Sequence, residues 1–524
     1  MNIENINNMI GYQIGIQAAH RPDALAVVYG ERRLSYAELH ARSCRLAGAL
    51  AAQGVQRGDR VAALLYNCPQ FFEAMFACAM LGAVFAPINF RLVAREVGQI
   101  LDSCTPRLLL AGEGFADLLG NLQTHQSYPA KVYWIDDQPP AAAATPDTAY
   151  ERWIAAYAAS EPDGVVPADA VQMLLHTSGT TGLPKGIMFT HATTLASSMA
   201  KIIDFSLTPQ DVTVVFGPLF HAGPLMDLAL PLLLRGGRVV LGASRQFDPQ
   251  SLLQTVARQR GTVIPIYPTM LRRVLATPPE PGLDLGSLRL IITGGEAAPV
   301  PVIEGVHERF PNVAFINNYG CTESGPVTTF LAPQDSLRKI GSVGKESFGV
   351  QVRIVDEAGR ALGAGEVGEL TVRGPFVCPG YWMRPEATAA QSRDGWWFTG
   401  DLASRDEEGF IWIAGRIKDM VKSGTENIYP IEVEQVIAAI DGVVEVGVIG
   451  VPDPDWGESV VAFVVLAQGC DLDAARTIEY CRMHLASYKK PRHVRFVESL
   501  PRGTTNKVAK NVLRKMWDDG LSAG

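Results

Sequence analysis

The sequence predicts an α/β protein. We expect a large N-terminal domain of parallel α/β sheets, a small β-barrel-like subdomain within it, and a small mobile α+β C-terminal domain. Three observations predict this organisation. Short apolar runs alternate with helical patterns in the first part of the chain, short turn-bounded strands begin near Gly341, and a compact α+β pattern follows Gly415. We therefore expect boundaries that give residues 1–340, 341–415 and 416–524.

The N-terminal part shows the alternation most clearly. Residues 36–54 carry apolar side chains at helical spacing and end in Gly54, residues 60–65 form a continuous apolar run, and residues 71–81 are helical again. Strands that are buried on both faces have continuous apolar sequences, so this pattern predicts parallel sheets covered by helices. Further elements of these kinds are expected as strands at 171–175, 187–190, 212–216, 238–241, 263–266 and 288–292 and a helix at 249–258.

The remaining elements are shorter. Residues 351–355 and 368–373 predict antiparallel strands with turn-rich connections. In the C-terminal part, the expected elements are a helix at 430–440, strands at 443–449 and 460–465, and a helix at 474–486.

The composition excludes several classes of protein. Among 524 residues, 46 are Lys or Arg and 54 are Asp or Glu, and a net charge of −8 argues against non-specific nucleic-acid binding. The hydrophobic fraction of 47% excludes a largely disordered chain. The N-terminus lacks a signal-peptide pattern, and the longest apolar stretch, 222–234, contains Asp227 and is too short to span a bilayer. We expect a cytoplasmic protein without an integral membrane segment. Its eight cysteines, none in CxxC spacing, are expected to be reduced thiols.

The most distinctive motif is residues 177–186, Thr-Ser-Gly-Thr-Thr-Gly-Leu-Pro-Lys-Gly. Its glycines free the backbone, its hydroxyls offer donors and Lys185 supplies a cation, which is the composition of a polyphosphate-binding loop. It differs from the Walker loop at Pro184 and Gly186. A formal dinucleotide-binding pattern at 363–368 leads into a strand-like run, so we assign it to a turn.

This loop is followed by further motifs in a fixed order, and together they resemble the adenylate-forming superfamily. The resemblance covers about residues 12–515 and is closest to the acyl-CoA synthetase branch. The motifs are Tyr-Gly-Cys-Thr-Glu at 319–323, Thr-Gly-Asp at 399–401, Gly-Arg-Ile-Lys-Asp at 415–419 and Lys507, with 424–434 and 452–458 most similar to the CoA ligases.

The resemblance implies a two-step reaction that uses ATP, Mg²⁺ and coenzyme A. A carboxylate first attacks the α-phosphorus of ATP to give acyl-AMP and pyrophosphate. The CoA thiol then displaces AMP. Negative charge accumulates around phosphorus in the first step, so positioned cations and hydrogen-bond donors are needed.

The resemblance also implies roles for residues at the nucleotide. Glu323 would hold Mg²⁺, Thr322 would contact phosphate, and Lys507 would reach the α-phosphate and the acid. Asp401 would accept the ribose hydroxyls with help from Arg416. The β- and γ-phosphates would be wrapped by Thr177, Ser178, Gly179, Thr180, Thr181, Gly182 and Lys185, and the adenine would be lined by Gly294, Gly295, Glu296, Asn318, Tyr319 and Gly320.

Lys418 resembles the family hinge, about which the C-terminal domain would turn between the two half-reactions. The segment expected to line the CoA pantetheine tunnel is Lys422, Ser423, Gly424, Thr425 and Glu426. Two positions depart from the family pattern, since Asn506 and Thr425 stand where relatives usually carry glycine. Asn tolerates positive φ best among the other residues, so the turn before Lys507 can survive.

The acyl pocket is expected from the same resemblance, with His221 as a gate near the carboxylate. These segments are apolar and offer no acidic side chain to an amino group, so we expect an acid with an uncharged tail. Both a medium- or long-chain fatty acid and an aromatic or alicyclic acid remain open. The pocket residues are Phe220, His221, Ala222, Gly223, Met226, Tyr267 and Gly294.

Other functions remain open. The adenylate could be transferred to the pantetheine arm of a carrier protein, although we find no carrier domain or large insertion. Oxidative luminescence shares the adenylate step, and an inactive nucleotide-binding scaffold is the alternative of another class. The intact set Lys185, Glu323, Asp401, Arg416 and Lys507 argues against the scaffold. The sequence leaves the oligomeric state open, with a homodimer as one option.

Overall fold

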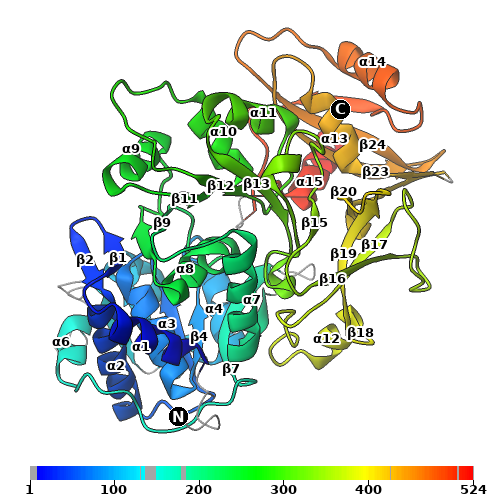
Figure 1. Cartoon of the computed structure of the whole chain (residues 1–524). Helices are drawn as coiled ribbons and strands as arrows, with labels where there is room; N and C mark the ends of the chain where they lie inside the picture. Colours follow the sequence, from blue (N-terminus) through cyan, green and yellow to red (C-terminus); the bar gives the residue numbers. More distant parts are fainter. Residues whose placement is uncertain are drawn as a thin grey trace. The chain divides into compact units, whose positions relative to one another are not determined.

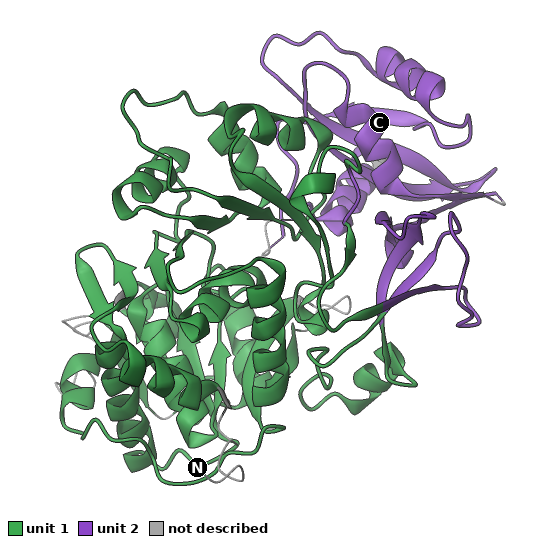
Figure 2. Ribbon diagram, viewed as in Figure 1, with its two compact units in different colours: residues 1–340, 344–351, 372–397 green, residues 341–343, 352–371, 398–524 purple. Residues whose placement is uncertain are grey.

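The computed structural model divides the chain into two compact units (Figure 2). Unit 1 comprises residues 1–340, 344–351 and 372–397, and unit 2 comprises 341–343, 352–371 and 398–524. The structure describes residues 9–129, 131–135, 149–178, 184–424, 426–503 and 507–522. Within these ranges no helix is long and apolar enough to cross a membrane.

Unit 1 contains a nine-stranded sheet in the order β15-β14-β13-β12-β11-β9-β10-β1-β2 (Figure 1). Its strands are β1 (Leu25–Tyr29), β2 (Arg32–Ser35), β9 (Val212–Val215), β10 (Arg238–Leu241), β11 (Val263–Pro265), β12 (Leu290–Thr293), β13 (Ala314–Tyr319), β14 (Thr329–Leu331) and β15 (Lys345–Glu346). All neighbours from β13 to β1 are parallel, whereas β2, β14 and β15 are antiparallel.

A second sheet of unit 1 has six strands in the order β6-β5-β3-β4-β7-β8. They are β3 (Arg60–Leu64), β4 (Val84–Pro87), β5 (Leu108–Gly112), β6 (Val132–Ile135), β7 (Val171–Ser178) and β8 (Pro184–Thr190). All pairs are parallel except β7 with β8. The expected parallel sheets are therefore confirmed in their centres and become antiparallel at edges. The loop between β7 and β8 is too short for the crossover that a parallel pair requires.

Helices form layers on these two sheets. Side chains from α9, α10 and α11 share one apolar cluster with β9, β11 and β12. On the opposite face, helices α1, α2, α3 and α8 join side chains of both sheets in one core, and α4 packs on the far face of the six-stranded sheet. The helices are α1 (Met9–His20), α2 (Tyr36–Ala52), α3 (Pro69–Leu81), α4 (Ala94–Cys104), α5 (Ala116–Gly120), α6 (Tyr150–Ala155), α7 (His191–Asp204), α8 (Leu230–Arg235), α9 (Pro249–Gln259), α10 (Pro268–Ala276), α11 (Val300–Arg309) and α12 (Pro385–Gln391).

Residues 341–415 contribute a small sheet in the order β16-β17-β19-β18, with β20 on β19. Its strands are β16 (Gln351–Val355), β17 (Gly368–Arg373), β18 (Ser392–Arg393), β19 (Trp396–Arg405) and β20 (Ile411–Arg416). The bounds of β16 and β17 match the predicted strands residue for residue.

The C-terminal part of unit 2 is α+β, as predicted. Its sheet has the order β22-β21-β24-β23, and β25 adds to β24 in parallel. The elements are β21 (Val421–Ser423), β22 (Glu426–Ile428), β23 (Val443–Asp453), β24 (Gly457–Leu466), β25 (His493–Phe496), α13 (Pro430–Ala438), α14 (Ala474–His484) and α15 (Lys510–Ser522).

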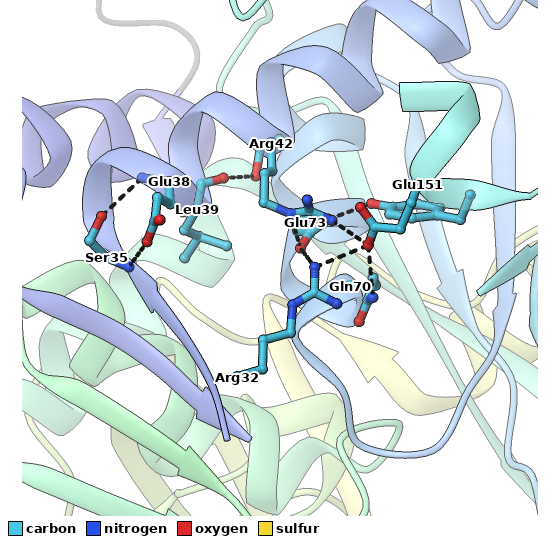
Figure 3. Close-up of polar contacts among 10 residues, drawn as sticks. Arg32, Ser35, Glu38, Leu39, Arg42, Gln70, Glu73 and Glu151 are labelled. Carbon is cyan, nitrogen blue, oxygen red and sulfur yellow. Dashed lines mark hydrogen bonds and ion pairs between the residues drawn. The ribbon is translucent and has the colours of Figure 1, made fainter. Parts of the chain in front are cut away.

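A buried ion cluster joins α2, α3 and α6 (Figure 3). The Glu73 side chain is fully buried, and Arg42 donates to both of its oxygens, at 2.8 Å from Nε and 3.1 Å from Nη2. The Tyr150 hydroxyl donates to Glu73 Oε2 at 2.6 Å. Arg42 and Arg32 also reach Glu151, at 2.8 and 3.0 Å. A charge this deep is stable only while its partners remain.

Glu73→Gln should therefore destabilise the protein strongly. The neutral amide cannot balance the guanidinium of Arg42, so we expect the free energy of unfolding to fall by about 3 kcal/mol. Glu151→Gln is the matched control, because that carboxylate is 41% exposed and its loss should cost about 1 kcal/mol or less. Urea denaturation of both variants measures the difference, and equal costs would contradict the assigned importance of burial.

Two histidines, His176 and His191, have buried ring nitrogens. Neither ring nitrogen of His176, on β7, or of His191, which begins α7, has a partner among the described residues. Burial lowers the pKa of each imidazole to about 4. Both rings are therefore neutral in the folded protein at physiological pH.

This depressed pKa predicts acid sensitivity. The unfolded chain binds protons near pH 6.5 and the folded chain near pH 4, so stability is complete above pH 6.5 and is lost as pH falls toward 4. Each histidine should account for about 3 kcal/mol over that window. In urea titrations at pH 7 and pH 5, His176→Gln and His191→Gln should each weaken the pH dependence relative to the wild type. An unchanged slope in both variants would refute this origin.

Candidate functional site

Most of the predicted site residues of unit 1 follow one edge of the nine-stranded sheet. Strands β9, β11, β12 and β13 are parallel, and their carboxyl ends therefore open on the same edge (Figure 1). The segments that leave these ends contain Phe220–Gly223, Tyr267, Gly294–Glu296 and Asn318–Glu323. In open α/β sheets, this edge is where ligands bind.

The turn after β12 is built for close approach. A Cβ on Gly294 would collide with the Asn318 side chain, and Gly295 has φ of +83° with the Tyr267 ring 3.1 Å from its Cβ position. Only glycine fits both positions. Glu296, predicted at the adenine, accepts a hydrogen bond from the backbone N–H of Thr269 at 2.9 Å, in the first turn of α10.

The segment after β13 is held by backbone and hydroxyl contacts. A Cβ on Gly320 would overlap the Pro326 backbone, so this glycine permits the chain to turn back on itself. Thr322 and Glu323 lie on a short 3₁₀ helix, Thr322–Ser324. Inside it, buried Ser324 accepts the N–H of Cys321 at 3.1 Å and lies 2.6 Å from the Thr328 hydroxyl. The backbone that carries Thr322 and Glu323 is therefore well fixed.

Tyr381 links two predicted phosphate-site residues, and the sequence interpretation missed it. Its hydroxyl donates to Glu323 Oε1 at 2.8 Å, and the Lys185 ammonium lies 4.8 Å from its ring centroid. Backbone bonds hold this arrangement, since Trp382 N–H donates to Gly186 at 2.7 Å and Cys378 N–H donates to the Glu323 carbonyl at 2.8 Å. Lys185 also faces Thr177 in the β7–β8 register. Tyr381 lies far from both residues in the sequence, so no local signal marked it.

Lys201 contacts Gly325, the residue after the Thr322–Ser324 helix. The sequence interpretation did not identify it. Its fully buried ammonium donates to Ser197 Oγ at 2.9 Å and to the Gly325 carbonyl, and it lies 4.7 Å from the Phe376 ring centroid. Burial lowers the pKa of Lys201, and the charges of Asp227 and Asp204 oppose that shift. Lys201 thus ties helix α7 to the residue that ends the Glu323 turn.

Three of the predicted acyl pocket residues after β9 are buried and apolar. Phe220, Ala222 and Met226 are 6%, 7% and 1% exposed, and the ring of the half-buried His221 lies 4.2 Å from that of Phe220. A buried acidic residue, Asp227, lies in the same π-helical segment, Gly223–Ala229. The predicted pocket was expected to lack an acidic side chain, but Asp227 directly follows Met226, the last predicted residue of this segment.

The ribose-site candidates of unit 2 are paired with each other. Asp401 and Arg416 are neighbours across β19 and β20, and Arg416 Nε lies 2.8 Å from Asp401 Oδ1. The Asp401 side chain is 7% exposed and that of Arg416 is 45% exposed. Gly400 has φ of +73° and donates its N–H to Glu369 at 3.0 Å, which fixes the turn before Asp401.

The predicted hinge and CoA segment lie close together in the sequence of unit 2. Lys418 is on the short 3₁₀ helix Ile417–Asp419. The N–H of Lys422 donates to Glu458 at 2.7 Å, and that of Gly424, at φ of +64°, donates to the Trp456 carbonyl at 2.7 Å. Ser423 and Glu426 pair across β21 and β22.

Lys507 is exposed, and its carbonyl accepts the N–H of Gly503 at 2.8 Å. Several predictions fall outside the described residues: Gly179, Thr180, Thr181, Gly182, Thr425 and Asn506. Ser178 is described as the end of β7, opposite Pro184.

The donor set suits a magnesium ion bound mainly by substrate. Among the described residues no group of three or more His, Cys, Asp or Glu side chains could hold a metal. Mg²⁺ commonly uses one or two carboxylates together with phosphate oxygens and water. Glu323 fits that pattern, because within the described part of the chain Tyr381 occupies only its Oε1.

Comparisons with known proteins identify the family of this chain. The family of AMP-binding enzymes matches residues 15–382, and the AMP-binding enzyme C-terminal domain matches residues 432–507. A feruloyl-CoA synthase from an Amycolatopsis species is 38% identical over 96% of this chain and 97% of its own length. An indoleacetate–CoA ligase from Aromatoleum aromaticum is 36% identical over 95% of this chain and 96% of its own.

A solved structure shows the same fold. ATP-bound MatB from Rhodopseudomonas palustris aligns with a TM-score of 0.88 at 32% identity, covering 98% of this chain and 99% of that one. The predicted fold class and the resemblance to adenylate-forming enzymes are both confirmed. The chain belongs to the AMP-binding enzyme family.

Proposed function

We propose that this chain is an ATP-dependent carboxylic acid–CoA ligase. It would convert an acid and ATP into acyl-AMP and pyrophosphate, and then transfer the acyl group to CoA with release of AMP. The observation that carries the proposal is that Lys185 and Glu323 both contact Tyr381. The Lys185 ammonium lies over the Tyr381 ring, and the Tyr381 hydroxyl donates a hydrogen bond to Glu323, which follows β13 of the nine-stranded sheet. A cation and a metal-binding carboxylate held on one side chain suit the transfer of a nucleotidyl group from a polyphosphate.

In the first half-reaction, a carboxylate oxygen of the acid bonds to the α-phosphorus and the bond to the pyrophosphate oxygen breaks. Lys185 and Thr322 would stabilise the charge that passes to pyrophosphate. Bound Mg²⁺, held by Glu323, would screen the phosphate charges. The sequence motif assigns the same role to residues 179–182, which lie outside the described ranges.

Several of the predicted residues would recognise the nucleoside. Tyr319, Asn318 and the Gly294–Glu296 turn would line adenine, and Asp401 would accept the ribose hydroxyls. The ion pair with Arg416 supports this role, because it keeps the Asp401 carboxylate oriented. Lys507 would stabilise the approaching carboxylate and the α-phosphate.

The second half-reaction needs Lys507 to withdraw so that the thiol can enter. Rotation near Lys418 would achieve this, and Lys422, Ser423, Gly424, Thr425 and Glu426 would then line the path of pantetheine. The hydrogen bonds from Lys422 and Gly424 to the neighbouring 456–458 turn support a preformed segment.

The acid would have an apolar body. The buried Phe220, Ala222 and Met226 support this class, since a charged tail among them would be poorly solvated. Two relatives are named for aromatic acids, feruloyl and indoleacetate, and another, from Mycobacterium tuberculosis, is named for long-chain fatty acids, so the proposal includes both aromatic and fatty acids.

The direct test is AMP release by the purified protein with MgATP, CoA and a panel of fatty, aryl and amino acids. We expect CoA-dependent AMP release with apolar acids. Lys507→Ala should lower adenylation by at least about 100-fold while ATP binding persists, because its charge acts on the transition state. The neighbouring Lys510→Ala is the control, since Lys510 pairs with Glu434 at 2.7 Å. No AMP with any acid would overturn the proposal, and AMP release that ignores free CoA would favour transfer to a carrier protein.

Tyr381 provides a second test. Tyr381→Phe keeps the ring under Lys185 but removes the hydrogen bond to Glu323, so the KM for MgATP should rise about three- to tenfold. Tyr381→Leu removes both contacts and should raise it further. Initial rates at varied MgATP measure the effect, with Tyr157→Phe, which packs beside Gly48, as the control. Unchanged KM in both Tyr381 variants would show that this side chain does not organise the phosphate site.

A further inference from the structure

A buried carboxyl group in the acyl pocket has an unused oxygen. Asp227 is 9% exposed, and its Oδ1 is buried without a hydrogen-bond partner among the described residues. Leaving such an oxygen unsatisfied costs free energy, so a buried carboxyl without a partner indicates a missing donor. No residue role described above uses Asp227.

The other carboxyl oxygen, Oδ2, lies beside Gly223. A Cβ at Gly223 would lie 3.7 Å from Asp227 Oδ2 and 3.4 Å from the Tyr267 hydroxyl oxygen. These two polar atoms therefore face the same small volume, the one that a side chain at residue 223 would occupy. The Tyr267 ring also lies 3.1 Å from the Cβ position of Gly295, at the turn predicted to contact the nucleotide.

The charge of Asp227 is already opposed by Lys201. Lys201 acts on Asp227 electrostatically, while its own hydrogen bonds go to Ser197 and Gly325. Burial raises the pKa of the Asp227 carboxyl, and Lys201 opposes this shift. A cationic group on the substrate would be repelled by the Lys201 ammonium, and a second carboxylate on the substrate would be repelled by Asp227. A neutral donor suits this environment best.

We infer that Asp227 and Tyr267 recognise a hydroxyl group on the tail of the acid, and that the preferred substrates are hydroxyaryl carboxylic acids. The inference rests on the proposed ligase function. A hydroxyl can donate to Asp227 and accept from Tyr267 at once, which a ring N–H cannot do. The reacting carboxylate must point away from Asp227, because like charges repel.

An aromatic tail fits this site better than a flexible chain. The Tyr267 side chain lies beside Gly223 and Gly295, the rings of Phe220 and His221 lie 4.2 Å apart, and aromatic rings pack favourably against each other. A rigid ring also holds its hydroxyl at a fixed distance from the carboxylate, so fewer rotors are immobilised on binding.

Matched substrate pairs test the inference. AMP release would be measured with hydroxycinnamic acids against cinnamic acid and with hydroxyphenylacetic acids against phenylacetic acid, each hydroxylated at ring position 3 or 4. The wild-type kcat/KM should favour the hydroxylated member of at least one pair by about tenfold or more. Three further acids serve as comparison substrates. Indole-3-acetate carries a ring N–H, an aryl dicarboxylate carries a second anion, and an aminoalkyl aryl acid carries a cation.

Three variants separate recognition from general damage. Asp227→Leu should bring the hydroxyl preference to about one, whereas Asp227→Asn, which retains an acceptor oxygen, should keep a reduced preference. Asp204→Asn is the control. It removes the other carboxylate that acts on Lys201, but its contacts are with Ser347 and Phe348, so the preference should remain.

The outcomes distinguish this inference from the proposed function. AMP release from apolar acids without any hydroxyl preference would overturn the role of Asp227 and leave the ligase proposal intact. The same holds if the wild type prefers the anionic, cationic or N–H comparison substrate, or if Asp227→Leu keeps the hydroxyl preference. Absence of AMP with every acid would overturn the ligase proposal itself.

Discussion

The parallel pairing of β9, β11, β12 and β13 is the constraint on which the unit 1 site depends. Each strand is short and largely buried, and the segment at or after its carboxyl end contains predicted site residues. Parallel pairing brings these four turns to one edge although they are spread over about a hundred residues of sequence. Hydrophobic burial of the strands thus positions polar side chains that contribute little to folding.

Two tertiary ties then fix the functional turns. The segment Gly380–Trp382 pairs with β8 and brings Tyr381 between Lys185 and Glu323. From the other side, Lys201 fixes Gly325, the residue after the Glu323 turn. Both ties use side chains from segments with no phosphate-binding motif of their own. Pre-organisation of the site therefore depends on residues that would not contact the nucleotide.

The sequence predicted the fold well where the signal is local. Strands such as β10 and β16 were placed residue for residue, because apolar runs and turn residues mark their ends. The motif residues Glu323 and Asp401 were recognised by resemblance. Tyr381, Lys201 and Asp227 were not, for physical reasons. In the sequence, Lys201 resembles a surface lysine on an amphipathic helix, and Asp227 only interrupts an apolar stretch. Their importance arises from long-range contacts that no spacing rule reveals.

The pairing of Lys201 with Asp227 also explains why the pocket can keep a carboxyl in an apolar environment. An isolated buried charge is strongly unfavourable. Burial raises the pKa of the Asp227 carboxyl and lowers the pKa of the Lys201 ammonium, so it favours the neutral form of each group. The opposite charges compensate each other in part, yet the ammonium directs its hydrogen bonds to Gly325 and Ser197. The carboxyl is therefore stabilised by charge without being saturated by hydrogen bonds. A direct salt bridge would have tied the carboxyl to Lys201, whereas this arrangement leaves Oδ1 without a hydrogen bond among the described residues and Oδ2 facing the volume beside Gly223.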